Sequence, residues 1–145
     1  MISHVLALAL KELGYQVALL YDYDSSIRNQ KITAHLTYDQ HPVDNPVIDE
    51  ADILVRLHPK GEELIARKTV CETGLCTDEE VPFGRMGIDK FGQAVFGNMI
   101  ALGRLFRLIG IDISQIELEK LLPKSYVKEN RGALQIGYDL GLYED

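Results

Sequence analysis

The residues of this chain that could do chemistry are few, and its two cysteines come first among them. Cys71 and Cys76 have the spacing C-x4-C. A zinc site needs about four ligands and an iron–sulfur cluster usually about four thiolates, so this pair cannot complete either site by itself. The spacing predicts two ordinary thiols in a reducing cytosol, because a chain of this size needs no disulfide framework. A metal half-site that a partner chain completes is the alternative.

The histidines and glycines match no catalytic or phosphate-binding motif. The four histidines show neither H-x-H nor H-E-x-x-H spacing, and nothing supports a hydrolase triad. Neither G-x-G-x-x-G nor G-x-x-x-x-G-K-[ST] occurs in the sequence. The stretch Gly84-Arg85-Met86-Gly87 precedes a predicted helix and could present backbone amides to an anion, but a simple turn is the favoured interpretation.

Two basic residues, Arg28 and Lys31, follow the first predicted strand. In an open α/β sheet this is where the ligand crevice lies. The planar guanidinium of Arg28 could hold a phosphate or a carboxylate there. A solvated loop arginine is the ordinary alternative.

Five glycines fall inside predicted helices, where each costs about 1 kcal/mol relative to alanine. The usual compensation is a close approach of the backbone to another element of the same chain or to a partner subunit. Internal packing is favoured here, with a subunit surface as the alternative. The five are Gly92, Gly97, Gly103, Gly132 and Gly137.

Two asparagines, Asn98 and Asn130, occur within or at the start of the same predicted helices. Asparagine is a poor helix former because its side chain competes for backbone hydrogen bonds. Each is therefore expected to bond to a neighbouring loop, and a catalytic role is the less favoured interpretation.

The elements that must position these residues are predicted as a helix, then strands, then further helices. Apolar residues at helical spacing indicate a first helix over 3–14 that ends at Gly14. Strands are predicted over 16–21, 32–38, 51–57 and 69–71, loops over 22–31 and 41–49, helical turns over 60–67 and irregular structure over 72–84. One long helix is predicted over 88–109, a short helix that begins at a capping box (Ser114–Glu117) and stops at Pro123, and a last helix over 128–141. This order predicts an α/β fold with helices packed on a small sheet.

Length, composition and charge place the chain among ordinary globular domains. The chain has 145 residues, of which 46% are hydrophobic, and a formal net charge of −7. One domain over residues 1–145 is expected. The acidic balance disfavours a nucleic-acid surface, and no apolar run reaches the length of a membrane span. The N-terminus has no signal-peptide pattern, so a cytoplasmic location is expected.

Three stretches resemble, in order, the motifs of one known family. The stretches cover residues 24–58, 97–103 and 130–138. The first contains Arg28-Asn29-Gln30, Thr37-Tyr38-Asp39, Pro42-Val43…Pro46-Val47-Ile48 and Ala51-Asp52-Ile53-Leu54; the others contain Gly97-Asn98-Met99-Ile100-Ala101-Leu102-Gly103 and Asn130-Arg131-Gly132-Ala133…Gly137-Tyr138. They resemble the R-G-G turn, the strand ending in S-D, the P-I…P-x-I…A-D-x-L segment, the N-M-x-x-L-G helix and the N-x-x-A…G-Y closing helix of the gamma subunit, or gamma domain, of 2-oxoacid:ferredoxin oxidoreductases (the pyruvate/ketoisovalerate oxidoreductase family).

The chain also departs from the family pattern. The family usually begins with a strand and a G-G-x-G-G-Q-G turn, and this chain is expected to lack both. Asn29 and Gln30 stand where the family has glycines, and the segment between the third strand and the long helix is shortened. A missing first strand would leave unpaired backbone groups at a sheet edge, which predicts a partner chain or a homodimer.

The resemblance implies a Rossmann-like α/β gamma domain and an accessory, non-catalytic role. The complex would oxidatively decarboxylate a 2-oxoacid to an acyl-CoA and pass the electrons to ferredoxin. The implied partners are the thiamine-binding alpha and beta subunits and a ferredoxin-like subunit, with no nucleic acid and no membrane. Thiamine diphosphate, iron–sulfur clusters and coenzyme A are implied for the complex, and none is expected on this chain alone. If a ligand or partner site is present, we expect Arg28, Asn29 and Gln30 to form it, with Asn98 supporting the loop.

Two other functions remain open from the sequence. The first is a stand-alone module that binds coenzyme A or a nucleotide. The second is a structural or oligomerisation protein whose catalytic ancestry is vestigial.

Overall fold

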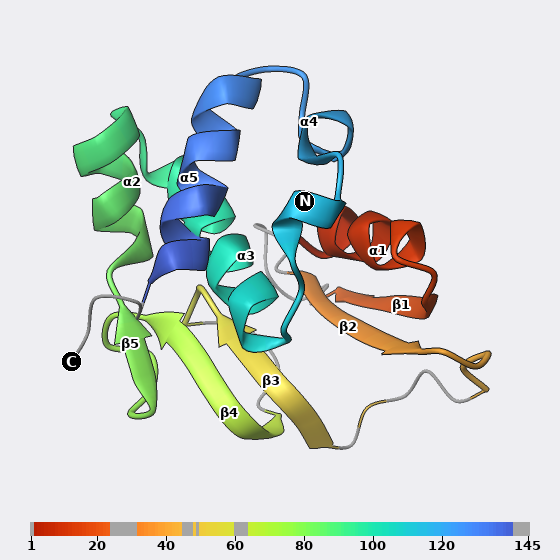
Figure 1. Cartoon of the computed structure of the whole chain (residues 1–145). Coiled ribbons are helices and arrows are strands. Elements are labelled where there is room, and N and C mark those ends of the chain that lie inside the picture. Colours follow the sequence, from red (N-terminus) through yellow and green to blue (C-terminus); the bar gives the residue numbers. More distant parts are fainter. Residues whose placement is uncertain (1, 24–31, 45–47, 49, 60–63, 141–145) are drawn as a thin grey trace. The chain divides into compact units, whose positions relative to one another are not determined.

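The computed structural model describes residues 2–23, 32–44, 48, 50–59 and 64–140, and its elements follow the predicted order of helix, strands and helices (Figure 1). These residues divide into two units at residue 80, with the strands in the first unit and most helices in the second. The α/β fold class predicted from the sequence is confirmed, although the strands form two small sheets and not one.

The first helix, α1 (Ile2–Glu12), confirms the prediction over 3–14. Its apolar residues recur every three or four positions and are buried, whereas Lys11 and Glu12 are exposed. Gly14 follows the helix with a φ of +95°, a conformation that suits glycine, and its N–H donates to the carbonyl oxygen of Lys11. The Ser3 hydroxyl lies 3.3 Å from the Tyr21 hydroxyl, which ties the helix to the following strand.

The next two strands, β1 (Gln16–Tyr23) and β2 (Ile32–Asp39), confirm the strands predicted over 16–21 and 32–38. They pair antiparallel, with Gln16 opposite Asp39 and Tyr23 opposite Ile32. Residues 24–31, with Arg28 and Lys31, lie outside the described residues. The ligand crevice predicted after the first strand requires parallel strands, whose carboxyl ends lie at the same edge of a sheet. Because β1 and β2 are antiparallel, they cannot frame such a crevice, and this prediction is wrong.

The second sheet has the order β3–β4–β5, with bounds Glu50–Arg56, Ile65–Glu72 and Glu79–Val81. The pair β3 and β4 is parallel, with Glu50 opposite Ile65 and Arg56 opposite Cys71. The helical turns predicted over 60–67 are therefore wrong for residues 65–67, and residues 60–63 lie outside the described part. The strand predicted over 69–71 is the second half of β4, and the segment predicted to be irregular contains β5. Pairing along β3 supplies the backbone hydrogen bonds that overrule the weak local helical preference.

The long helix predicted over 88–109 is instead three elements. These are α2 (Phe83–Phe91), the short 3-10 helix η1 (Ala94–Phe96) and α3 (Gly97–Leu108). Gly92 ends α2 with a φ of +84°, and its N–H donates to the Ile88 carbonyl oxygen at 2.9 Å. The apolar residues of α2 continue at helical spacing across Gly92 into α3. Periodicity alone therefore predicts one helix over 88–109. The stretch Gly84–Gly87 lies inside α2, so it is neither the predicted turn nor a loop.

The capping box predicted at Ser114 is also wrong. Asp112 precedes the 3-10 helix η2 (Ile113–Gln115), and its carboxylate accepts from the Ser114 N–H at 3.0 Å and from the Ser114 hydroxyl at 2.6 Å. These two bonds hold the pKa of Asp112 below its usual value. Helix α4 (Leu118–Leu121) follows and ends before Pro123, as predicted, and α5 (Val127–Asp139) confirms the last helix.

The second unit is built on a close crossing of α3 and α5. A methyl group added at Gly103 would collide with the Leu134 carbonyl oxygen and would lie 2.7 Å from the Tyr138 nitrogen. One added at Gly137 would collide with the Ile100 carbonyl oxygen and lie 3.0 Å from the Arg104 nitrogen. The internal packing favoured for these glycines is therefore confirmed. Around them lie fully buried side chains, among them Phe83, Met99, Ile100, Leu102, Phe106 and Leu134.

We expect Gly137→Ala to lower the free energy of unfolding by about 3 kcal/mol, because the new methyl group forces two helix backbones apart. Gly132→Ala is the matched control on the same helix. A Cβ at Gly132 would meet only the Phe91 ring, at 3.4 Å, and alanine favours a helix by about 1 kcal/mol. Urea unfolding followed by circular dichroism measures both variants, and equal stabilities would refute the close crossing.

Candidate functional site

The residues predicted to form a ligand or partner site are not brought together by the described structure. Arg28, Asn29 and Gln30 lie outside the described residues. Asn98 is half-buried in the first turn of α3. The other asparagine, Asn130, is buried in α5, and its Nδ2 donates to the Ser125 carbonyl oxygen at 3.3 Å. The loop contact expected of Asn130 is confirmed, and its role there is structural.

The two cysteines form a disulfide, so the prediction of two ordinary thiols is wrong. Cys71 is fully buried near the end of β4, Cys76 lies half-buried before β5, and their Cα atoms are 6.1 Å apart. Between them the chain reverses at Gly74, which has a φ of +87°. A glycine turn between two cysteines is the signal that could have indicated the bridge from the sequence.

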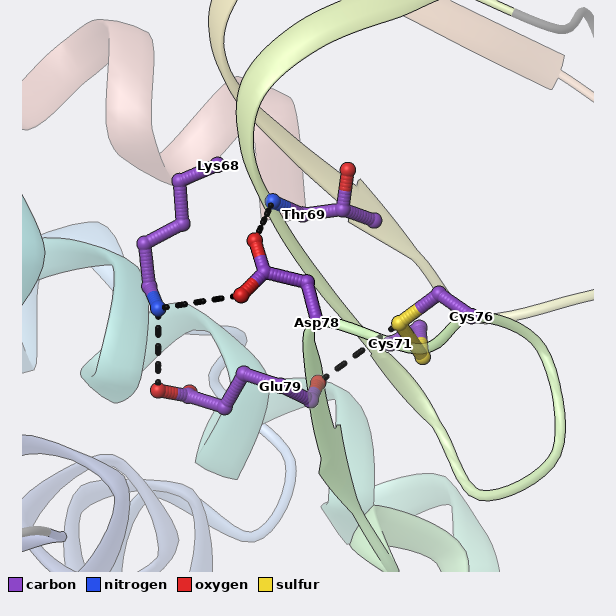
Figure 2. The surroundings of a disulfide bond; sticks show 6 residues. All are labelled: Lys68, Thr69, Cys71, Cys76, Asp78 and Glu79. Atoms are coloured by element: carbon purple, nitrogen blue, oxygen red, sulfur yellow. Dashed lines mark hydrogen bonds and ion pairs between the residues drawn. A yellow bond between two sulfur atoms is a disulfide. The ribbon is translucent and has the colours of Figure 1, made fainter.

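Polar groups on both sides of this turn join β4 to β5 (Figure 2). The Lys68 ammonium lies 3.4 Å from a Glu79 carboxylate oxygen and 3.9 Å from one of Asp78. The other Asp78 oxygen accepts from the Thr69 N–H at 2.9 Å. The Cys76 sulfur lies 3.7 Å from the Glu79 carbonyl oxygen, a contact only, since a disulfide sulfur has no proton to donate. This turn is thus held by a covalent bond, two ion pairs and a hydrogen bond from a backbone N–H to a carboxylate, all within a few residues.

A second set of titratable groups lies in the first unit around Tyr38. The Tyr38 ring meets the Tyr15 ring edge to face, with centroids 5.2 Å apart. Burial raises the pKa of Tyr38, and the nearby Tyr15 and Asp52 raise it further. A phenol whose pKa is raised stays protonated near neutral pH, so Tyr38 is not a general base there.

A group of polar contacts in the second unit joins α3 to the end of α5. The Arg107 guanidinium stacks 3.7 Å from the centroid of the Tyr138 ring, and its Nε donates to the Tyr138 carbonyl oxygen at 2.8 Å. Arg107 also pairs with Asp139 at 3.7 Å, and the Tyr138 hydroxyl donates to the Ile111 carbonyl oxygen at 2.7 Å. This planar arrangement suits arginine and not lysine. These contacts hold the end of α5 against α3.

The described residues contain neither a metal-binding cluster nor a membrane-spanning helix. No group of three or more His, Cys, Asp or Glu side chains is placed to hold a metal ion there. Likewise, none of the helices described is long and apolar enough to cross a membrane. The class that the fold defines is an α/β protein with two small sheets and packed helices.

The comparisons with known proteins agree on one class of relative. No family model matches the chain. A 2-oxoglutarate synthase subunit, KorC from Archaeoglobus fulgidus, is 27% identical over 94% of this chain and 78% of its own length. The crystal structure of a keto/oxoacid ferredoxin oxidoreductase gamma subunit from Geobacter sulfurreducens superposes with a TM-score of 0.68, covering 99% of this chain and 90% of that one at 16% identity.

The structural match, at 16% identity, shows the fold alone. The sequence match makes the chain similar to a 2-oxoglutarate synthase subunit, which is the kind of protein that its motifs resemble.

We expect loss of the disulfide to lower the free energy of unfolding by about 2 kcal/mol, because the bond closes a short loop in the unfolded chain. Cys76→Ser is the suitable variant, since Cys76 is half-exposed and a hydroxyl there can bond to water, whereas Cys71 is fully buried. Urea midpoints with and without a thiol reductant measure the effect. The reductant should shift the wild-type midpoint and leave that of Cys76→Ser in place; an unshifted wild type would contradict a stabilising bridge.

Proposed function

We propose that this chain is the non-catalytic gamma subunit of a complex that oxidatively decarboxylates a 2-oxoacid to an acyl-CoA and passes the electrons to ferredoxin. The observation that carries the proposal is the sequence likeness to KorC over 94% of the chain. The shared fold with a keto/oxoacid ferredoxin oxidoreductase gamma subunit supports it. The chain acts as one functional domain over residues 1–145, which the 99% coverage of that structural match supports.

The chemistry of the reaction belongs to the other subunits in this proposal. Thiamine diphosphate is bound by the alpha and beta subunits, and the iron–sulfur clusters by other subunits, including a ferredoxin-like one. The assignment of the clusters to other subunits is supported by the disulfide, because neither Cys71 nor Cys76 is then a thiolate ligand. The residues Arg28, Asn29 and Gln30, with Asn98, remain the proposed contacts to an anionic ligand or to a partner.

The cytoplasmic location expected from the sequence is part of the proposal. The Cys71–Cys76 bridge is unusual for that location, because a reducing cytosol keeps most thiols reduced. Alkylation of cells with a thiol reagent before lysis, followed by mass spectrometry of this segment, measures the fraction that is bridged in place.

Reconstitution tests the function. The chain should co-elute with the alpha, beta and ferredoxin-like subunits from the same source. Adding it should raise the rate at which the complex reduces ferredoxin with a 2-oxoacid and coenzyme A. Elution of the chain by itself, together with an unchanged rate when it is omitted, would contradict the proposal.

The same preparation separates the other two functions. A stand-alone binding module would be stabilised by coenzyme A or a nucleotide, by about 2.7 kcal/mol at a ligand concentration one hundred times the Kd. A structural protein would form a homo-oligomer in light scattering and respond to neither ligand. Arg28→Ala should weaken binding of the anionic ligand or partner and leave the fold intact; unchanged binding would remove Arg28 from the site.

A further inference from the structure

We propose that an apolar surface of the second unit, bordered by lysines, binds another subunit of the oxidoreductase through a complementary surface of carboxylates around an apolar centre. This inference rests on the proposed function. The surface, called the lysine-bordered patch below, consists of Ile88, Phe91, Val95 and Tyr126. In the chain, Lys90 is next to Phe91, and Lys124 and Lys128 are each two residues from Tyr126.

The patch is built around a single buried ring. Phe96 is only 5% exposed, and its ring centroid lies 5.5 Å from that of Phe91 and 5.9 Å from that of Tyr126. The Phe91 ring also lies against α5, since it is 3.4 Å from where a Cβ on Gly132 would stand, an ordinary van der Waals distance. Figure 1 shows α2 and α5 side by side, in keeping with this contact. Aromatic rings from α2, η1 and the start of α5 therefore form one continuous cluster.

The outer members of the cluster remain open to solvent. The exposed fractions are 47% for Ile88, 51% for Val95 and 60% for Tyr126. Exposed apolar side chains are ordinary when scattered. Here Tyr126 belongs to the aromatic cluster, Ile88 lies three residues before Phe91 on α2, and Val95 is next to Phe96 on η1. Exposed aromatic residues grouped in this way are typical of protein interfaces.

The backbone at Tyr126 gives an independent reason to assign a role to this surface. Tyr126 has a φ of +60°, and among the described residues it is the one non-glycine residue with a positive φ. This conformation costs of order 1 kcal/mol for a residue with a side chain. Burial of the Tyr126 side chain does not compensate for this conformational cost, since most of the side chain is exposed. The unfavourable backbone instead presents the ring at the surface, edge-on to Phe96.

The charged residues that neighbour the patch in the chain have a net charge opposite to that of the whole chain. The whole chain has 22 acidic against 15 basic residues, whereas Lys90, Lys124 and Lys128 each lie within two residues of a patch member. In the same two stretches the carboxylates are Asp89, which pairs with Arg85 at 3.2 Å, and Glu129 in the first turn of α5. A partner that presents carboxylates around an apolar centre would therefore be attracted and correctly oriented.

The same charge argues against a second copy of this chain as the occupant. A twofold interface between two copies would place one lysine-bordered patch on another. The lysines would then face lysines around a desolvated centre, and like charges at an interface are unfavourable. A different subunit with acidic residues fits the surface better.

Binding of the purified other subunits to this chain, measured by titration calorimetry, tests the inference. Val95→Asp should weaken binding at least tenfold, because it places a carboxylate in the apolar centre. Lys128→Glu should weaken binding severalfold at low salt and less at high salt. A carboxylate in the first turn of α5 is favourable to the helix, so this variant should fold at least as well as the wild type.

Ile65→Asp is the matched control, because Ile65 is 74% exposed in the first unit, away from the patch residues in sequence and element. It should bind as the wild type does. If Val95→Asp, folded by circular dichroism, also binds like the wild type, the patch is not the interface, although the chain still joins the complex. If the wild-type chain binds none of the subunits, the proposed function itself fails. If the isolated chain dimerises in light scattering and Val95→Asp abolishes the dimer, the occupant is a second copy and the inference is overturned.

Discussion

The crossing of α3 over α5 is the constraint on which the second unit depends. At Gly103 and Gly137 each helix lies against the backbone of the other, nearer than any residue with a side chain permits. This proximity brings Arg107 onto the Tyr138 ring and lets Arg104 donate to the Leu140 carbonyl oxygen at 3.2 Å. The start of α5 is then fixed beside η1, where the rings of Phe96 and Tyr126 meet. Two residues without side chains thus determine where several large side chains can lie.

The sequence was informative where a local pattern and the tertiary structure agree. The amphipathic face of α1, the strand β2 and the close packing at Gly103 and Gly137 all follow from local signals and are found as predicted, whereas Gly92 ends α2 instead of lying inside a helix. The sequence was misleading where pairing with a distant part of the chain determines the local structure. Residues 65–67 form a strand because β3 pairs with them, and no local pattern contains that information. The break at Gly92 was hidden because the apolar spacing of α2 continues in phase into α3.

The features of the candidate site also fall into those that the sequence could predict and those that it could not. The glycine positions and the loop contact of Asn130 could be predicted, since both follow from the energetic cost of these residues in helices. The disulfide could not be derived from C-x4-C spacing alone, because the bond depends on the register of β4 and β5 around the turn at Gly74. The aromatic cluster at Phe96 joins three elements that are separate in the sequence, and only the crossing of α3 and α5 brings them together. A positive φ at a tyrosine leaves no pattern in the sequence.

The helix crossing also has a mechanical consequence. Two helices in backbone contact cannot slide past or rotate against one another without leaving that contact, and closely packed interiors compress very little. A displacement imposed at the Tyr126 end of α5 is therefore carried to α3 and to the Arg107–Tyr138 stack at the other end of the helix. The two helices move as one rigid body.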